Sequence, residues 1–373
     1  FAWYVPQAIY ILIMRAHLMG SIQRKQYRGH TAAQYDFRRM RIGKDVELRK
    51  GRDVAALTVC TAHDHQLPDM VRDVRRHDQR CRHIGHRPGD DDRNFIRPGR
   101  PKSADQGVDG ICILANFSEQ FLISDAERDH LMRLCLAHVD GRVPVIVTIS
   151  HFATQIAVER SRLAKKLGAA IVMMMAPYHG ALLKGTADQT FEQAKAVGEV
   201  GIPIMIQDAP LSGVELPVPL LVRMATEIDM VKLFKIESVG VAGKLRQLLA
   251  AGGSAIEGPF DGEEAITLLA DLDAGATGSM TSALIPDLIG PVIAAHAAGN
   301  RQEAVAGYTR ILPVINHENR QCGFRAAKAA MVEGKIIKSD FCRHPTAPLH
   351  PETRAGLLEL LTPLDPIVLT WGH

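Results

Sequence analysis

Asp229-Met230-Val231-Lys232-Leu233-Phe234-Lys235-Ile236-Glu237 is an apolar stretch that carries two lysines and a glutamate. A helical segment precedes it and Gly240 follows it, which is typical of a short β-strand. Because side chains alternate along a strand, one face is expected to hold Val231, Leu233, Lys235 and Glu237. Burying a lysine and a glutamate side by side is costly unless they pair or serve a function. The stretch is therefore either an ion pair on a surface strand or part of a site.

The chain around this stretch alternates between predicted strands and predicted helices from Gly107 onward. The apolar strands are continuous, which is typical of parallel strands buried on both faces. We predict a (β/α)8 TIM barrel with extra C-terminal helices from Asp287 onward. An open doubly wound sheet is the alternative, but no GxGxxG motif follows any predicted strand. Besides the opening stretch, the predicted strands are 108–115, 143–148, 169–175, 203–207, 254–258 and 276–280. The predicted helices before residue 287 are 124–138, 153–167, 190–200, 217–227, 241–251 and 262–274.

Residues 1–106 differ from the rest and are treated as a separate, poorly ordered segment before the barrel at 107–373. They hold 17 Arg and 4 Lys against 11 Asp and 1 Glu, a net charge of 21 − 12 = +9. A basic arm could bind nucleic acid, but the charges are interleaved with His and Asp and form no binding motif. The segment is either a translated out-of-frame or upstream stretch, or a genuine disordered extension. The first barrel strand and helix are unrecognised, with weak candidates at 53–61 and 67–76.

The composition excludes several classes of protein. No run of 18 apolar residues occurs, so no transmembrane span is expected. The six cysteines have no metal-ligand spacing, which favours a cytoplasmic protein with free thiols. Aromatic residues make up only 5% of the chain, so a stacking surface for nucleic acid is not expected.

Polar residues gather where the predicted strands end, which is where TIM barrels carry out catalysis. Burial of Lys235 among apolar residues would disfavour its charged form and make a neutral amine available. Such an amine attacks a ketone and forms a Schiff base, which acidifies the adjacent carbon. The strand-end groups are Asn116-Phe117-Ser118-Glu119, Ser150-His151, Pro177-Tyr178-His179-Gly180, Gln207-Asp208-Ala209-Pro210, Lys235-Ile236-Glu237, Glu257-Gly258 and Gly278-Ser279-Met280.

In order and spacing these motifs resemble the dihydrodipicolinate synthase / N-acetylneuraminate lyase family over about residues 107–340. The resemblance implies that Lys235 is the Schiff-base lysine. It also implies that the turn Asn116, Phe117 and Ser118 binds the keto-acid carboxylate. A homotetramer acting on a small 2-keto acid, with no metal and no cofactor, is the further implication. Tyr178, His179, Gly258 and Ser279 complete the predicted substrate-binding residues.

Departures from the family pattern favour dehydration. The family's proton-relaying tyrosine is replaced by Gln207, and an amide can only position other groups. Glu237, on the face of Lys235, could remove a C3 proton and protonate a leaving hydroxyl. The motifs resemble the branch of the family that converts 2-keto-3-deoxy-L-arabonate to α-ketoglutarate semialdehyde and water. The alternatives are a pyruvate-dependent aldolase of 2-keto-3-deoxy sugar acids, a dihydrodipicolinate synthase-like enzyme, and a non-catalytic binder of keto acids.

Several other polar residues have two interpretations. His151 and His179 either cap loops or touch substrate, and Ser279 is expected to hydrogen-bond a substrate hydroxyl. Glu263-Glu264 are expected to cap the helix predicted at 262–274. His317-Glu318-Asn319 lacks the second histidine of HExxH, so no zinc site is predicted there.

Overall fold

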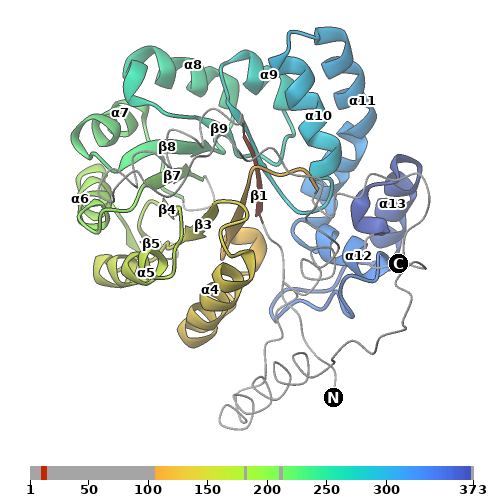
Figure 1. Ribbon diagram of the computed structural model, residues 1–373, viewed down its shortest axis with the longest axis horizontal. Coiled ribbons are helices and arrows are strands. Elements are labelled where there is room, and N and C mark those ends of the chain that lie inside the picture. The colour runs from red at the N-terminus through yellow and green to blue at the C-terminus, as the bar shows by residue number, and fades with distance from the viewer. Residues whose placement is uncertain (1–9, 15–105, 180–182, 210–212, 371–373) are drawn as a thin grey trace, which may run out of the picture.

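A closed barrel organises the protein. The computed structural model describes residues 10–14, 106–179, 183–209 and 213–370. Within these residues the strands close in the order β1-β10-β9-β8-β7-β4-β3-β2. Helices surround the ring of strands, and α12 and α13 lie together beyond α11 (Figure 1). The predicted TIM barrel with extra C-terminal helices is confirmed.

The strands from β2 to β10 in the barrel pair in parallel, which brings their carboxyl ends to one mouth. A separate two-stranded hairpin follows β4. The barrel strands are β2 Gly110–Ile113, β3 Val145–Thr148, β4 Ile171–Met175, β7 Ile204–Asp208, β8 Val231–Ile236, β9 Phe260–Asp261 and β10 Gly278–Thr281; the hairpin is β5 Tyr178–His179 with β6 Leu183–Lys184.

The strand that the sequence left unrecognised lies at Tyr10–Met14, named β1. It closes the barrel between β10 and β2 and runs antiparallel to both. An isolated strand carries no signal of what it pairs with, so only the closed sheet identifies it. The weak candidates at 53–61 and 67–76 lie outside the described residues.

The helices follow their sequence signals closely where a cap is present. Ser124 and Glu127 form the predicted capping box. A second box, between Thr186 and Gln189, starts its helix three residues before the predicted position. The helices are α4 Asp125–Val139, α5 Thr154–Lys166, α6 Ala187–Gly198, α7 Val218–Glu227, α8 Val241–Gly252, α9 Leu268–Asp273, α10 Pro286–Ala297, α11 Arg301–His317, α12 Arg325–Glu333 and α13 Pro351–Leu361. In the described part of the chain, none is long and apolar enough to span a membrane.

Two predicted elements around β9 are wrong. The strand predicted at 254–258 begins in a 3-10 turn, Gly253–Ala255, and the paired residues are Phe260–Asp261. Pro259 has no N–H to donate to a strand ladder, so regular pairing starts after it. The helix predicted at 262–274 starts only at Leu268. Glu264 and Ala265 have φ of 56° and 67°, a left-handed conformation that an α-helix cannot contain. Glu263-Glu264 therefore do not cap a helix.

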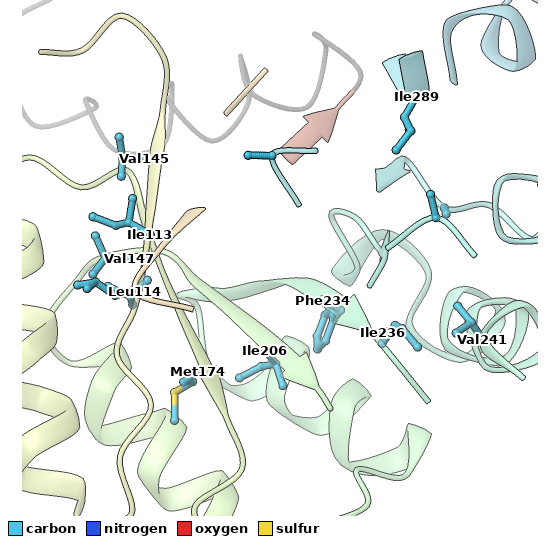
Figure 2. Close-up of a cluster of buried hydrophobic side chains, with 14 of the residues drawn as sticks. Ile113, Leu114, Val145, Val147, Met174, Ile206, Phe234, Ile236, Val241 and Ile289 are labelled. Atoms are coloured by element: carbon cyan, nitrogen blue, oxygen red, sulfur yellow. The ribbon is translucent and has the colours of Figure 1, made fainter. Parts of the chain in front are cut away.

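Alternate strand residues face two separate cores. One core joins strands to helices, and Figure 2 shows members such as Val147, Ile206 and Phe234. The other consists of strand side chains and Ala115, two residues after β2, with no helical member, so it fills the inside of the barrel. We call it the luminal cluster: Cys112, Ala115, Ile146, Ile171, Met173, Met205, Leu233, Phe260 and Met280.

The predicted face of the opening stretch is correct from Leu233 onward and wrong at Val231. Val231 belongs to the helix-side core, whereas Leu233 belongs to the luminal cluster. The register between β7 and β8 shifts at this point, from Ile204 paired with Val231 to Met205 paired with Leu233. One extra residue on β8 reverses the alternation there.

Candidate active site

Lys235 is a luminal lysine with no exposed surface. It lies two residues after Leu233 of the luminal cluster, and its strand partner is Phe260 of the same cluster. Its ammonium group contacts Oε1 of Glu237 in a buried ion pair. The predicted pairing of this lysine and glutamate is thus present, and it lies inside the barrel rather than on a surface strand.

Gln207 completes this group from the neighbouring strand. It pairs with Lys235 in the β7–β8 register. Its Nε2 donates a hydrogen bond of 2.8 Å to Oε1 of Glu237. The amide fixes the carboxylate that faces the lysine and cannot itself transfer a proton. The structure therefore brings together the three residues predicted to be catalytic.

Gly262 gives the Lys235–Glu237 pair the space it occupies, and it was not among the predicted site residues. A Cβ at this position would lie 2.5 Å from Cγ of Glu237 and 2.8 Å from Cγ of Lys235. Only a residue without a side chain fits there. Gly262 was predicted to begin the helix 262–274, so its place directly after β9 and its neighbours in space were unknown.

The wall around Lys235 is apolar and contains one thiol. Burial raises the pKa of Cys112 to about 12, so this thiol keeps its proton at neutral pH. Its sulfur lies 3.6 Å from Oγ1 of Thr148. Lys235 is therefore the nucleophile that this part of the lumen offers.

The predicted carboxylate-binding residues form a 3-10 turn, Asn116–Ser118, directly after β2. Phe117 packs against the luminal cluster. Oδ1 of Asn116 accepts a hydrogen bond of 2.6 Å from Nε2 of Gln120. The turn thus lies at the barrel mouth beside the lumen.

Tyr178 and His179 lie on the β5–β6 hairpin rather than on a barrel strand. The Tyr178 ring is half-buried and meets Phe121 edge to face at 6.2 Å, and burial raises the pKa of its phenol. His179 is exposed. His151 takes the loop-capping alternative, since its Nδ1 accepts a hydrogen bond of 2.9 Å from the N–H of Ala153.

Ser279 faces away from the lumen, contrary to its predicted contact with substrate. It alternates with luminal Met280, and its hydroxyl donates a hydrogen bond of 2.6 Å to Asp261. Asp261 alternates with luminal Phe260 in the same way and also accepts the backbone N–H groups of residues 263 and 265. Burial raises the pKa of this carboxyl. The pair braces the turn after β9.

Gly258 is buried beside the luminal Phe260 ring. A Cβ there would lie 3.5 Å from that ring, which is an ordinary contact. Its role in binding substrate stays a prediction.

A further buried carboxyl belongs to Glu318, for which the sequence predicted no zinc site. It lies in the π-helical turn Glu318–Cys322 at the end of α11 and accepts a hydrogen bond of 2.5 Å from Oγ of Ser282. Burial raises its pKa to about 7. Among the described residues, no three His, Cys, Asp or Glu side chains gather as a metal site.

The TIM barrel that holds this site agrees with the comparisons with known proteins. The model of the dihydrodipicolinate synthetase family matches residues 102–363. This chain belongs to that family. The match excludes β1, so the family part supplies every parallel strand of the barrel.

Known members of the dihydrodipicolinate synthetase family cover most of this chain. L-2-keto-3-deoxyarabonate dehydratase of Azospirillum brasilense is 57% identical over 270 residues, or 72% of this chain and 87% of that protein. 4-Hydroxy-tetrahydrodipicolinate synthase of Acidiphilium cryptum is 30% identical over 264 residues, which cover 69% of this chain and 87% of that protein. The crystal structure of dihydrodipicolinate synthase from Aquifex aeolicus superimposes with a TM-score of 0.65 at 22% identity, covering 70% of this chain and 88% of that one, which supports the fold.

Proposed function

We propose that this protein is a Schiff-base-forming hydro-lyase that converts 2-keto-3-deoxy-L-arabonate to α-ketoglutarate semialdehyde and water. The observation that carries the proposal is the luminal contact between Lys235 and Glu237, with Gln207 fixing the carboxylate. The 57% identity to a dehydratase of that substrate class supports it.

The reaction begins at Lys235. Glu237 accepts the proton that the lysine must lose, and the neutral amine attacks the C2 carbonyl. Glu237 returns this proton to the carbinolamine hydroxyl, which leaves as water and gives a protonated imine that draws electrons from C3. Glu237 then removes a C3 proton and returns it to the C4 hydroxyl, which leaves as water.

The remaining steps move the double bond. Elimination leaves a C3=C4 bond conjugated with the imine. A proton lost from C5 and one gained at C3 shift the bond to C4=C5, where it forms an enol. Hydrolysis of the imine frees Lys235, and the enol gains a proton at C4 to become the aldehyde. One water is consumed in hydrolysis and two are released, so the net loss is one water.

Gln207 separates this proposal from the aldolase alternative. In retro-aldol cleavage the C4 hydroxyl loses its proton, which the family's tyrosine could relay and the amide of Gln207 cannot. Glu237 instead faces the lysine nitrogen, where a C3 proton would lie. The aldolase would release pyruvate, whereas the dehydratase releases a semialdehyde.

The test combines product analysis with borohydride trapping. Incubation with 2-keto-3-deoxy-L-arabonate should yield the semialdehyde and no pyruvate, and reduction should leave a covalent adduct on Lys235. Lys235→Ala should abolish both. Lys232→Ala is the matched control, because Lys232 lies on the same strand and donates to the carbonyl of Ala225 in α7. Release of pyruvate would establish the aldolase, and unchanged ligand binding without any turnover would establish the non-catalytic binder.

We further propose a cytoplasmic homotetramer in which residues 107–373 are the catalytic unit. The family resemblance supports the assembly, and the family match from residue 102 supports the unit. Sedimentation of the full chain tests the assembly. Turnover by chains with and without residues 1–106 tests whether β1 is needed for activity.

A further inference from the structure

A buried ion pair joins the turn after β2 to a C-terminal helix. Lys328 of α12 contacts Oε2 of Glu119, and neither side chain has exposed surface. Nζ of Lys328 also donates a hydrogen bond of 2.9 Å to the carbonyl of Phe341. Oε1 of Glu119 accepts a hydrogen bond of 3.1 Å from the N–H of Arg343. Both charges are thus held by more than one hydrogen bond.

A buried ion pair of this kind does not by itself indicate that its role is to stabilise the fold. The cost of desolvating two charges offsets much of their attraction, and apolar replacements are often as stable. A buried pair does fix geometry, because either charge left without its partner would be strongly unfavourable. The role of the pair is therefore to be sought in the segment that Glu119 holds in place.

Glu119 ends the turn Asn116–Ser118. Its backbone has φ 52° and ψ 37°, and its N–H donates 3.1 Å to the carbonyl of Asn116. A left-handed conformation costs a residue with a side chain about 1–2 kcal/mol. The surrounding contacts must therefore maintain it, and they come from Lys328 and the backbone of Arg343.

Two more contacts tie the same regions together. The ring of Phe117 meets Phe324, the residue before α12, edge to face at 6.4 Å. The Arg343 guanidinium donates 3.1 Å to the carbonyl of Leu122 and also contacts both carboxylate oxygens of Glu127. The position of the turn at the mouth therefore depends on the C-terminal segment.

We propose that Lys328 is a positioning residue for the keto-acid carboxylate, acting through Glu119 on the turn Asn116–Ser118. The inference rests on the proposed function and on the predicted binding of the keto-acid carboxylate by that turn. Neutralising Lys328 should weaken binding of a carboxylate-bearing ketone and leave the reactivity of Lys235 toward other ketones unchanged.

The experiment measures borohydride trapping on Lys235 in the full chain at increasing concentrations of pyruvate and of methyl pyruvate. In Lys328→Met the half-saturating pyruvate concentration should rise about tenfold, the equivalent of one charge-assisted hydrogen bond. The value for the uncharged ester should change less than about twofold. Arg354→Met, which breaks a partly exposed ion pair with Glu333 on neighbouring helices, is the control and should change neither.

Substitution of Glu119, the partner of Lys328, gives an independent measurement. Glu119→Gln keeps the side-chain shape and should raise the half-saturating pyruvate concentration by a similar factor. Because the two residues act as one unit, the Glu119→Gln/Lys328→Met double variant should be no weaker than either single variant. If Lys328→Met does not fold, Glu119→Gln provides the same comparison.

The outcomes separate this inference from the proposed function. An unchanged half-saturating pyruvate concentration in a folded variant overturns the inference, and so does an equal loss for pyruvate and its ester. If wild-type protein forms no adduct with either ketone, the proposed function fails first.

Discussion

Gly262→Ala tests whether the Lys235–Glu237 contact is the reacting pair. The added Cβ would lie 2.5 Å from Cγ of Glu237, 2.8 Å from Cγ of Lys235 and 2.9 Å from the carbonyl oxygen of Ile236. Ordinary contacts of this kind begin at 3.4 Å. The two side chains or the backbone must therefore move by about 1 Å.

The expected effect follows from that displacement. Extra volume in a close-packed site costs about 1–3 kcal/mol of stability. A misplacement of about 1 Å in reacting groups lowers the rate by about a hundredfold. We therefore expect kcat/KM for sugar-acid dehydration to fall about a hundredfold, while the free energy of unfolding falls by only about 1–3 kcal/mol.

The assay compares initial rates of semialdehyde formation with urea unfolding of the same variant. Gly243→Ala in α8 is the matched control, because no heavy atom lies within 4 Å of its Cβ position. It should keep full activity and gain up to about 1 kcal/mol from helix propensity. A folded Gly262→Ala variant with wild-type kcat/KM would refute the assignment of Lys235 and Glu237 as the reacting pair.

Three further predictions concern Glu237, Gln207 and the buried carboxyl of Glu318. Glu237→Gln should lower kcat about 10²- to 10⁴-fold because an amide cannot move protons, and pyruvate should be trapped on Lys235 more slowly because the lysine loses its proton to Glu237; an unchanged kcat would contradict the role of Glu237 as acid and base. Gln207→Leu removes the 2.8 Å hydrogen bond to Glu237 and should lower kcat about tenfold, and an unchanged rate would contradict its positioning role. Burial raises the pKa of Glu318 from 4.5 to about 7, so the fold favours its protonated form. The stability it contributes is complete below pH 4.5 and is lost as pH rises through 7, a fall of about 3 kcal/mol. Urea unfolding of Glu318→Gln should show a correspondingly smaller fall, and an identical pH profile would show that another group is responsible.

The sequence predicted most of the barrel because buried parallel strands and capped helices leave local signals. The continuous apolar runs around Ile171 and Ile204 and the Ser124 capping box are examples. Around Pro259 these signals failed, because two left-handed residues and a residue without an N–H interrupt both periodicities. β1 is itself a short apolar run, YILIM, but its place in the barrel depends on the two strands it joins.

For the candidate site too, the sequence predicted some features and missed others. Residue type and alternation predicted that Lys235 and Glu237 share a face, and the family pattern placed Gln207 with them. Ser279 was misplaced because its strand is so short that the sequence could not show which face holds it. Chain order likewise gives no hint that Lys328 meets Glu119.

By itself, the sequence determined the class of fold, the family and the shared face of Lys235 and Glu237, because these depend on residue type and on short-range periodicity. Tertiary structure alone decided which faces point inward, that Gly262 must lack a side chain, and that α12 holds the turn at the mouth. Those features are contacts between segments far apart in the chain, and packing fixes them only when the barrel closes.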